Sequence, residues 1–423
     1  MKNKKLLSLF LLFFFLFMTP LSTFASYPII NASASILVDE VSGSVLYQDN
    51  IDEQRPMASI SKLMSIYIFL DEMSEKEIKL EDKYKISERV GQLKSQSSDI
   101  SGVWFTEGEV ITVEKLLELS FVYSDNSAMI QLAEIASGSE SAHVDKINEQ
   151  ARAWNLPNTV FVNVTGLNMI DYGVLQLPGI GENEYNKSSA RELASVIKKI
   201  LEKYPEVINY TSKSSIEFRG ETLNSFNMML PGLDEEYPGV TGLKTGTSDE
   251  AGYSFAGYYT YNGKNYISIV LGAKSTNARF EETKKMYNWI QGQSINVVVD
   301  KALSFKFNLK GDVAFNINLT PKNEILSIGG NGFNSTVSSI TYNKEYFDEN
   351  DRVIKNIPAG ETVATITLKN LKEQEVTTVD GTSDSFNVDL VSDSEINAQG
   401  KILSFFGSAL SYFQSLYNSI IKI

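Results

Sequence analysis

The chain has 423 residues and a formal net charge of −14 at pH 7. This length is too great for one ordinary hydrophobic core, so two or more domains are expected, and the acidic charge argues against a nucleic-acid backbone as partner. The absence of cysteine excludes thiol nucleophiles, disulfides and thiolate metal sites, and a single histidine, His143, leaves little basis for a Ser-His-Asp triad or a two-histidine zinc site.

The first 25 residues have the composition of a secretory signal peptide. Three lysines near the start precede an apolar run at residues 6–18, which is too short to span a bilayer. Small residues ending at Ala25 then provide a candidate cleavage site. We therefore expect residues 1–25 to be removed and the mature protein to be exported, with a retained membrane anchor as the alternative.

Residues 26–291 combine strand and helix patterns. Residues 36–47 are predicted to form two strands with a turn between them. Because further strands are predicted at the other end of the segment and helices between, we expect an α+β domain whose sheet is assembled from distant parts of the chain. His143 is expected to be an ordinary surface residue of one of these helices. Helices are predicted at 59–73, 113–123, 126–136, 142–154 and 279–291, and strands at 239–246, 252–261 and 266–274.

Residues 292–395 differ, because apolar and polar residues alternate over short stretches that turn residues separate. We expect a separate antiparallel β domain of about 100 residues, with no cluster of candidate catalytic residues. The polar stretch at 380–399 is predicted to be a linker. Strands are predicted at 296–299, 305–309, 313–319, 363–368 and 386–390.

The last segment, residues 396–423, is predicted to contain the end of the linker and an amphipathic helix that begins at Lys401. Apolar residues recur there every three to four positions, and a narrow serine-rich face lies between them. A terminal helix beyond a linker has little core to pack against, so the membrane surface is its expected partner through residues 401–423. Docking of the helix back onto the protein is the alternative.

Ser59 and Lys62 form the first of three short strings that carry chemistry. Ser59 stands at the start of a predicted apolar helix, and Lys62 returns to the same face one turn later. A serine hydroxyl is a weak nucleophile until a base takes its proton, and a lysine can do this when burial and the helix dipole favour its neutral form. The Ser59 N–H is a candidate oxyanion donor. Alone the S-x-x-K pattern is weak, because other stretches match it by accident.

The second string, Ser124-Asp125-Asn126, falls between two predicted helices. Ser124 can relay a proton to a leaving group, and the amide of Asn126 can bind a peptide group of the substrate. Serine, aspartate and asparagine are also the residues that cap helices, so this string alone has an equally good structural explanation.

The third string, Lys244-Thr245-Gly246, lies with Thr247 on a predicted strand. Lys244 and Thr245 can bind a carboxylate, and the Thr247 N–H is a candidate second oxyanion donor. A glycine weakens a strand but lets a substrate backbone lie close, which is the role expected for Gly246. The three strings in this order, within one predicted domain, are far more specific than any one of them.

With these strings, residues 26 to about 290 resemble the serine D-Ala-D-Ala carboxypeptidases, the low-molecular-mass penicillin-binding proteins. The β domain and the tail also match the usual layout of that family. The resemblance implies a penicillin-binding/β-lactamase-like catalytic domain, in which helices flank an antiparallel sheet, and it implies no cofactor. Beyond the three strings, the likeness includes residues 36–39, 43–47, 56–59, 161–163, 166–167, 242–246, 251–253, 271–273 and Arg279.

The resemblance further implies a substrate, peptidoglycan stem peptides that end in D-Ala-D-Ala, and covalent inhibition by β-lactams. Two positions depart from the family pattern: some relatives carry histidine in place of Thr247, and Val160 stands where a histidine usually precedes Phe161. The pH dependence and the deacylation rate can therefore differ from those relatives. The resemblance assigns the acyl-enzyme to Ser59, proton transfer to Lys62 and Ser124, and substrate binding to Asn126, Lys244, Thr245, Gly246, Thr247 and Arg279.

Three alternatives share parts of this pattern. A class A β-lactamase needs a glutamate in an E-x-x-L-N loop, and the nearest match, which begins at Glu221 and ends at Asn224, is one residue short. A D,D-endopeptidase that cleaves peptidoglycan cross-links shares the fold and the chemistry. A catalytically idle cell-wall binding protein is disfavoured by the intact strings. We therefore expect a carboxypeptidase that removes the terminal D-Ala from pentapeptide stems.

Overall fold

The computed structural model describes residues 27–97, 100–299, 303–309, 314–328, 335–370, 377–381 and 385–396. The predicted signal peptide and the predicted C-terminal helix lie outside these residues. Within the described ranges, no helix combines the length and the apolar character that crossing a bilayer requires.

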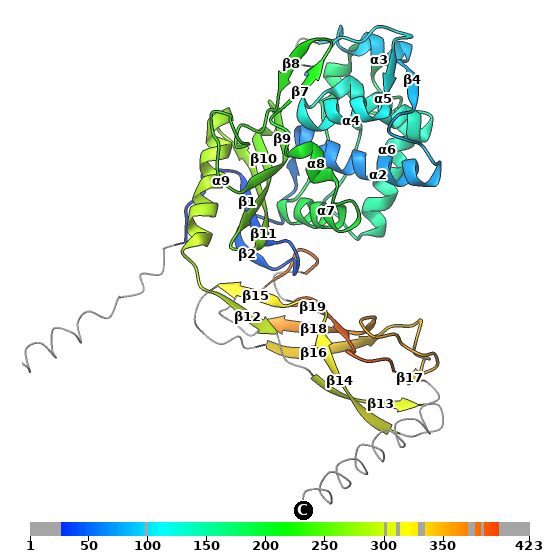
Figure 1. Ribbon diagram of the computed structural model, residues 1–423, viewed down its shortest axis with the longest axis vertical. Helices are drawn as coiled ribbons and strands as arrows, with labels where there is room; N and C mark the ends of the chain where they lie inside the picture. Colours follow the sequence, from blue (N-terminus) through cyan, green and yellow to red (C-terminus); the bar gives the residue numbers. More distant parts are fainter. Residues whose placement is uncertain are drawn as a thin grey trace, which may run out of the picture.

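An antiparallel sheet of five strands forms the centre of the larger part of the molecule (Figure 1). Its strand order is β2-β1-β11-β10-β9, so the N-terminal strand β1 pairs with β11, and Ala34 stands opposite Leu271. This confirms the predicted sheet assembled from distant parts of the chain. The five strands are β1 (Ala34–Asp39), β2 (Val45–Asp49), β9 (Val240–Ser248), β10 (Gly252–Tyr261) and β11 (Lys264–Ala273).

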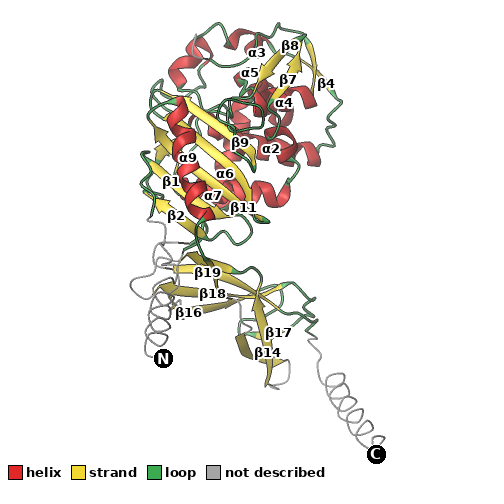
Figure 2. Cartoon of the chain, turned by 60° about the vertical axis from the view of Figure 1, so that its left-hand side comes forward, coloured by secondary structure: helices red, strands yellow, loops and turns green. Residues whose placement is uncertain are grey.

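Both faces of this sheet are buried. Along β1, Ile36 and Val38 belong to the main hydrophobic core, whereas Leu37 points into the second core on the opposite face. Helix α9 (Thr276–Gln291) packs on β10 and β11 over the second core, and α7 (Ala190–Lys203) packs on β1 and β11 (Figure 2). Helices on both sides of an antiparallel sheet confirm the predicted α+β class.

A helical region covers the main-core side of the sheet and surrounds helix α2 (Lys62–Glu75) (Figure 1). Most residues of α2 from Lys62 to Phe69 are buried, as expected for a helix that is apolar on most of its sides. The other helices of this region are η1 (Ala58–Ser61), α3 (Glu88–Leu93), α4 (Val113–Val122), α5 (Asn126–Ser137), α6 (Glu140–Ala153), η2 (Met169–Leu175) and α8 (Val207–Thr211). Three small hairpins or bridges complete it, formed by β3 (Arg55–Pro56) with β6 (Lys187–Ser188), β4 (Lys83–Lys85) with β5 (Val110–Thr112), and β7 (Ser215–Phe218) with β8 (Glu221–Asn224).

The surface position predicted for His143 is wrong. The side chain is fully buried on α6, where its two ring nitrogens lie 2.9 Å from the Ser137 hydroxyl and 2.9 Å from the Ser65 carbonyl oxygen. Burial lowers the pKa of His143 to about 4, so the ring is neutral at physiological pH. The helical period alone does not show that this side of α6 faces α2.

The second, smaller part of the molecule is built from strands. A six-stranded sheet has the order β16-β18-β19-β14-β13-β17, in which the short β13–β17 pair is parallel, and β12 pairs with β15. The predicted linker at 380–399 is wrong, because β19 lies inside this sheet with Phe386, Val388 and Leu390 buried. The strands are β12 (Ile295–Val299), β13 (Leu303–Leu309), β14 (Ala314–Pro321), β15 (Ile325–Ile328), β16 (Ser335–Tyr342), β17 (Arg352–Val353), β18 (Thr362–Asn370) and β19 (Ser385–Val391).

Residues 377–381 of the smaller part contact the larger one directly. The Val45 N–H donates to the Thr377 carbonyl at 2.8 Å, and the Val379 N–H donates to the Gly43 carbonyl at 2.9 Å. The Val379 side chain is buried in the main hydrophobic core. The guanidinium of Arg191 on α7 also donates to the Thr378 carbonyl at 2.8 Å. Both backbone and side-chain contacts therefore join the two parts.

Candidate active site

Ser59 lies in a 3-10 turn rather than at the N-terminus of an α-helix. The turn is η1, and α2 begins three residues later at Lys62. Ala58, directly before the serine, has a φ of +44°, a backbone conformation that is unusual for a residue with a side chain. The Ser61 hydroxyl donates to the Ala58 carbonyl at 2.6 Å and holds this turn together. The chain therefore presents Ser59 on a tightly constrained turn.

Lys62 is fully buried beneath Ser59 and has three polar neighbours. Its Nζ lies 2.8 Å from Oγ of Ser59, 2.7 Å from Oδ1 of Asn126 and 2.9 Å from the carbonyl oxygen of Thr165. Both of the latter atoms can only accept hydrogen bonds. A neutral amine has two N–H groups and one lone pair, so these two acceptors take the N–H groups and leave the lone pair facing the Ser59 hydroxyl.

The orientation of the Asn126 amide is fixed by its other end. Its Nδ2 donates to the carbonyl oxygen and to Oγ of Ser101, both at 3.0 Å, so Oδ1 must face Lys62. Asn126 is fully buried and begins α5. Its amide therefore touches the lysine instead of lining the cleft. Ser101, which no sequence motif singles out, is the residue that positions this amide.

Burial lowers the pKa of Lys62 to about 7, and the nearby charge of Asp125 opposes this shift. Asp125 is itself fully buried, and its burial raises the pKa of the carboxyl to about 6. Its carboxylate accepts from the Ala128 N–H at 2.8 Å and from the Val103 N–H at 2.6 Å, so it caps α5. A substantial fraction of Lys62 is therefore neutral near pH 7, as a general base requires.

Ser124 and Lys244 form a second contact next to the first. The Nζ of Lys244, on β9, donates to Oγ of Ser124 at 2.7 Å. Burial lowers the pKa of Lys244 well below its ordinary value, and the charges of Lys62 and Arg279 act in the same direction. Ser124 itself has a φ of +55°, and Ser59 directly follows Ala58, whose φ is +44°. Each serine of the site therefore lies at or next to an unusual backbone conformation.

Strand β9 lies at an edge of the central sheet and carries the third string. Arg279, near the start of α9, donates through Nη1 to Oγ1 of Thr247 at 3.0 Å and more weakly to the Gly246 carbonyl at 3.4 Å. Arg279 is almost completely buried, and its Nε has no hydrogen-bond partner among the described residues. A buried guanidinium with an unused donor is suited to binding an anion.

Gly246 has a packing role that the sequence does not reveal. A β-carbon on this residue would lie 2.7 Å from the Met57 carbonyl oxygen and 3.3 Å from side-chain atoms of Ala58 and Ile60. Gly246 is therefore needed for the close packing of β9 against η1, the turn that carries Ser59. Gly246 is not among the residues that line the cleft, and its expected role toward the substrate stays a prediction.

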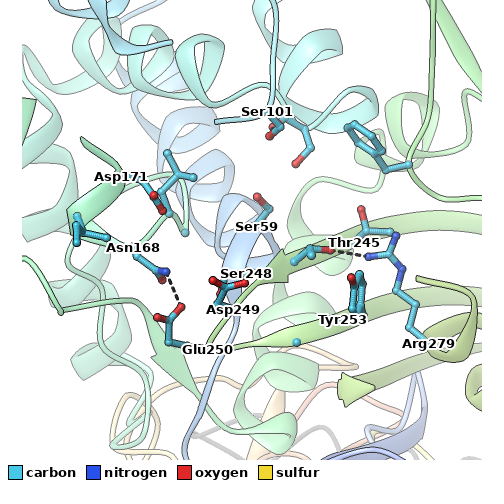
Figure 3. Close-up of a pocket in the computed structure, with 17 residues that line it drawn as sticks. Ser59, Ser101, Asn168, Asp171, Thr245, Ser248, Asp249, Glu250, Tyr253 and Arg279 are labelled. Carbon is cyan, nitrogen blue, oxygen red and sulfur yellow. Dashed lines mark hydrogen bonds between the residues drawn. The ribbon is translucent and has the colours of Figure 1, made fainter. Parts of the chain in front are cut away.

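A cleft of about 560 Å³ opens over these residues (Figure 3). Five of the predicted site residues line it directly, and Lys62, Asn126 and Lys244 lie behind its wall. The lining residues are Ser59, Ser101, Ser124, Gly166, Leu167, Asn168, Ile170, Asp171, Phe226, Thr245, Thr247, Ser248, Asp249, Glu250, Gly252, Tyr253 and Arg279.

The loop that supplies the Thr165 carbonyl is a functional element that no residue pattern in the sequence identifies. Oδ1 of Asn163 accepts hydrogen bonds from the N–H groups of Thr165 and Gly166, at 3.1 and 2.8 Å. This turn directs the Thr165 carbonyl toward Lys62. The segment belongs to the family resemblance, but a backbone carbonyl leaves no residue type by which its contact could be predicted.

Known proteins are similar to this chain in sequence. The family model of D-alanyl-D-alanine carboxypeptidases matches residues 22–275. The D-alanyl-D-alanine carboxypeptidase DacF of Bacillus subtilis is 30% identical over 263 residues, which are 62% of this chain and 62% of that protein. The match thus spans less than two thirds of that relative's length.

Two solved structures are also similar. The peptidoglycan synthesis regulatory factor PBP3 of Streptococcus pneumoniae is 30% identical, with a TM-score of 0.67 over 87% of this chain and 100% of that chain. Penicillin-binding protein D2 of Listeria monocytogenes, in its cefotaxime-bound form, is 26% identical with a TM-score of 0.51 over 63% of this chain and 99% of that chain. By its sequence and its fold, this chain belongs to the D-alanyl-D-alanine carboxypeptidase family, the low-molecular-mass penicillin-binding proteins.

Proposed function

We propose that this protein is a serine D,D-carboxypeptidase that removes the terminal D-Ala from peptidoglycan stem peptides. The observation that carries the proposal is the position of Lys62, whose amine touches the Ser59 hydroxyl while Asn126 and Thr165 take its two other hydrogen bonds. This arrangement supplies a nucleophile and a base without histidine.

In the acylation step, the neutral amine of Lys62 takes the proton of the Ser59 hydroxyl. The Ser59 oxygen forms a bond to the carbonyl carbon between the two D-Ala residues, and the backbone N–H groups of Ser59 and Thr247 would bind the resulting oxyanion. The C–N bond then breaks, and the amine of the departing D-Ala takes a proton delivered through Ser124, which Lys244 contacts. Water then attacks the carbonyl carbon of the ester, the bond to the Ser59 oxygen breaks, Ser59 regains its proton, and the tetrapeptide stem is released.

The edge position of β9 supports a binding mode for the peptide. An extended peptide can add to a sheet edge by main-chain hydrogen bonds, and β9 offers such an edge along the cleft. The C-terminal carboxylate would then lie at Thr245 and Arg279, where the buried guanidinium retains a donor without a partner among the described residues. Lys244 adds a positive charge behind them.

β-Lactams would acylate the same serine. The cefotaxime-bound state of the Listeria relative supports this reaction for the family. We propose the same covalent adduct on Ser59, because the groups that activate its hydroxyl toward the peptide would activate it toward a lactam carbonyl.

The class A β-lactamase interpretation is disfavoured by the position of its candidate base. Glu221 and Asn224 lie on β8 and neither lines the cleft. The endopeptidase interpretation uses the same catalytic groups and differs only in the leaving group, so it is decided by the substrate. An idle binding protein would not need a lysine held against the serine.

We further propose that residues 1–25 direct export and that residues 401–423 hold the enzyme at the outer face of the cytoplasmic membrane. Residues 26–291 would act as the catalytic domain, and residues 292–395 would set its distance from the wall. Deleting residues 401–423 should release the protein from membranes and leave its turnover in solution unchanged. Loss of turnover in the truncated protein would contradict this assignment.

The function is tested by measuring D-alanine release from a pentapeptide that ends in D-Ala-D-Ala. We expect release by the chain from residue 26 onward and none by Ser59→Ala, which should also fail to be labelled by fluorescent penicillin. If a folded protein labels with penicillin but releases no D-alanine, the carboxypeptidase assignment is wrong, and cross-linked muropeptides become the substrate to test.

A further inference from the structure

The two ends of the cleft carry opposite charge. Arg279 and Thr245 lie on one side of Ser59, whereas Asp249 and Glu250 lie on the other (Figure 3). Asp171 lines the same acidic end. Among the described residues that line the cleft, Arg279 is the one basic side chain. The cleft is therefore polarised along its length, with Ser59 near the middle.

The acidic end has a fixed geometry. Asp249 and Glu250 lie in the turn between β9 and β10, which the Ala251 N–H closes by donating to Oγ of Ser248 at 3.1 Å. Glu250 also accepts a hydrogen bond from Nδ2 of Asn168, across the cleft (Figure 3). Both carboxylates thus lie at the end of the strand that we propose as the edge for substrate binding, and Asn168 holds that of Glu250.

Asn168 gives an independent indication that a ligand belongs here. Its side chain lines the cleft and is 9% exposed, and its Oδ1 has no hydrogen-bond partner among the described residues. A buried amide oxygen without a donor is unfavourable. A ligand that brings N–H donors to this end of the cleft would remove that deficit.

We propose that the acidic end binds a free primary amine on the side chain of the third residue from the C-terminus of the stem peptide. This inference rests on the proposed carboxypeptidase function, and it names the substrate class that the enzyme prefers. An ammonium group has three donors and no acceptor, so it matches a set of acceptors made of Asp249, Glu250 and the Asn168 oxygen.

The proposed binding mode places the third residue at the acidic end. A peptide that adds antiparallel to β9, with its C-terminal D-Ala opposite Gly246, has the penultimate D-Ala opposite Thr247 and the preceding residue opposite Ser248. Asp249 and Glu250 follow directly. Successive residues of a strand are about 3.3 Å apart, so a side chain of lysine length reaches either carboxylate from that position.

The test compares two peptides that differ only in the third residue, L-lysine with a free ε-amine or Nε-acetyl-lysine, and both end in D-Ala-D-Ala. The measured quantity is the ratio of their kcat/KM values, which general damage to the catalytic site would not change. Two exposed carboxylates should give the wild-type enzyme a preference of about fivefold for the free amine, and added salt should weaken it.

The double variant Asp249→Asn/Glu250→Gln should lose this preference. The matched control Glu221→Gln/Asp234→Asn removes the same two charges from exposed positions outside the cleft and should keep it. In a second variant, Asp249→Lys, the preference should shift toward an Nε-succinyl-lysine peptide, because its side chain carries a negative charge. This variant tests the inference even if the double variant does not fold.

Equal kcat/KM values of the wild-type enzyme for the two peptides would overturn the inference, as would an unchanged preference in the double variant. Hydrolysis of the acetylated peptide would still support the proposed function in both cases. If penicillin labels the enzyme but neither peptide is hydrolysed, the proposed carboxypeptidase function is wrong. The inference about the acidic end is then wrong as well, because it rests on that function.

Discussion

The carbonyl oxygen of Ala58 lies so close to Gly166 that a β-carbon on residue 166 would stand 1.9 Å from it. Ala58 precedes the nucleophile, and Gly166 follows Thr165, whose carbonyl oxygen contacts Lys62. Gly166 has a φ of +82°, which glycine adopts without strain. The loop at 163–166 therefore supports the nucleophile turn and orients the base at the same time.

Gly166→Ala should impair acylation of Ser59. The new methyl group must push the Ala58 carbonyl away and displace Ser59 from Lys62, with a loss of stability of about 1–3 kcal/mol. The control is Gly220→Ala, where φ is +80° and an added methyl group would meet no atom of the described residues within 4 Å. Both variants place a side chain at a positive φ, but only Gly166→Ala creates a clash with the Ala58 carbonyl. Only this variant should therefore react slowly with penicillin. Equal labelling rates of the two would show that the contact is unimportant.

The acylation rate should rise with pH through a value of about 7. Below this pH Lys62 is protonated and cannot take the Ser59 proton, whereas above it the amine is neutral. The pKa of Lys62 in the folded protein lies below that of a lysine in the unfolded chain. At pH values between these two pKa values the unfolded state binds more protons, so the contribution of Lys62 to the free energy of unfolding rises with pH in that range. Stopped-flow acylation by a chromogenic β-lactam measures the profile, and a rate independent of pH from about 5 to 9 would contradict it.

Lys62→Arg should fold and fail to acylate. A guanidinium keeps its proton at any accessible pH, so the rate should fall roughly 10²–10⁴-fold, the usual contribution of a general base. Circular dichroism reports the fold, and labelling with fluorescent penicillin reports acylation. Normal labelling of this variant would exclude Lys62 as the base and make Lys244, the other buried amine of the site, the next residue to substitute.

Asp125→Asn should separate the structural role of Asp125 from its electrostatic one. Asparagine keeps one side-chain oxygen for the Ala128 N–H, but its amide nitrogen would face the Val103 N–H, so the loss of stability should be about 1–3 kcal/mol. The charge that raises the pKa of Lys62 is lost, so the rise of the acylation rate should move to lower pH. A shift to higher pH would show that Asp125 does not act on Lys62 by its charge.

Arg191→Ala should weaken the connection between the two parts of the molecule. Arg191 is almost completely buried, contacts Asp52, and donates to Thr377 and to Thr378. Its loss leaves the Thr378 carbonyl without this donor, at a cost of about 1–3 kcal/mol. We expect a lower melting temperature and an unchanged penicillin acylation rate. An unchanged melting temperature would show that the contact does not stabilise the protein.

The central features of the catalytic part can be predicted from the sequence, because short-range signals determine them. The spacing of Ser59 and Lys62 places both on one side of a helical turn, and strand patterns locate β9, β10 and β11. The contacts of Lys62 with Asn126 and Thr165 cannot be predicted in this way, since they join residues 64 and 103 positions apart in the chain. Such contacts depend on packing that periodicity does not describe.

The errors have the same origin. His143 lies on a helix whose period is clear in the sequence, but the period does not show which element each face contacts. The predicted linker at 380–399 overlaps the strand predicted at 386–390, and the structure confirms the strand as β19, whose Phe386, Val388 and Leu390 are buried. The packing role of Gly246 is missed because its neighbour, the Met57 carbonyl, lies far away in sequence.

The pairing of β1 with β11 has a consequence for how this protein acquires its structure. As the chain grows from its N-terminus, β1 and β2 form first but can make only a two-stranded hairpin, which is marginally stable alone. Their strand partner β11 is absent until residues 264–273 have been synthesised. The loop closed by this pairing is long, so folding should be slow and should begin among the helices, whose contacts are local. Until then, the unpaired edge of β1 is the part of the nascent chain most exposed to aggregation.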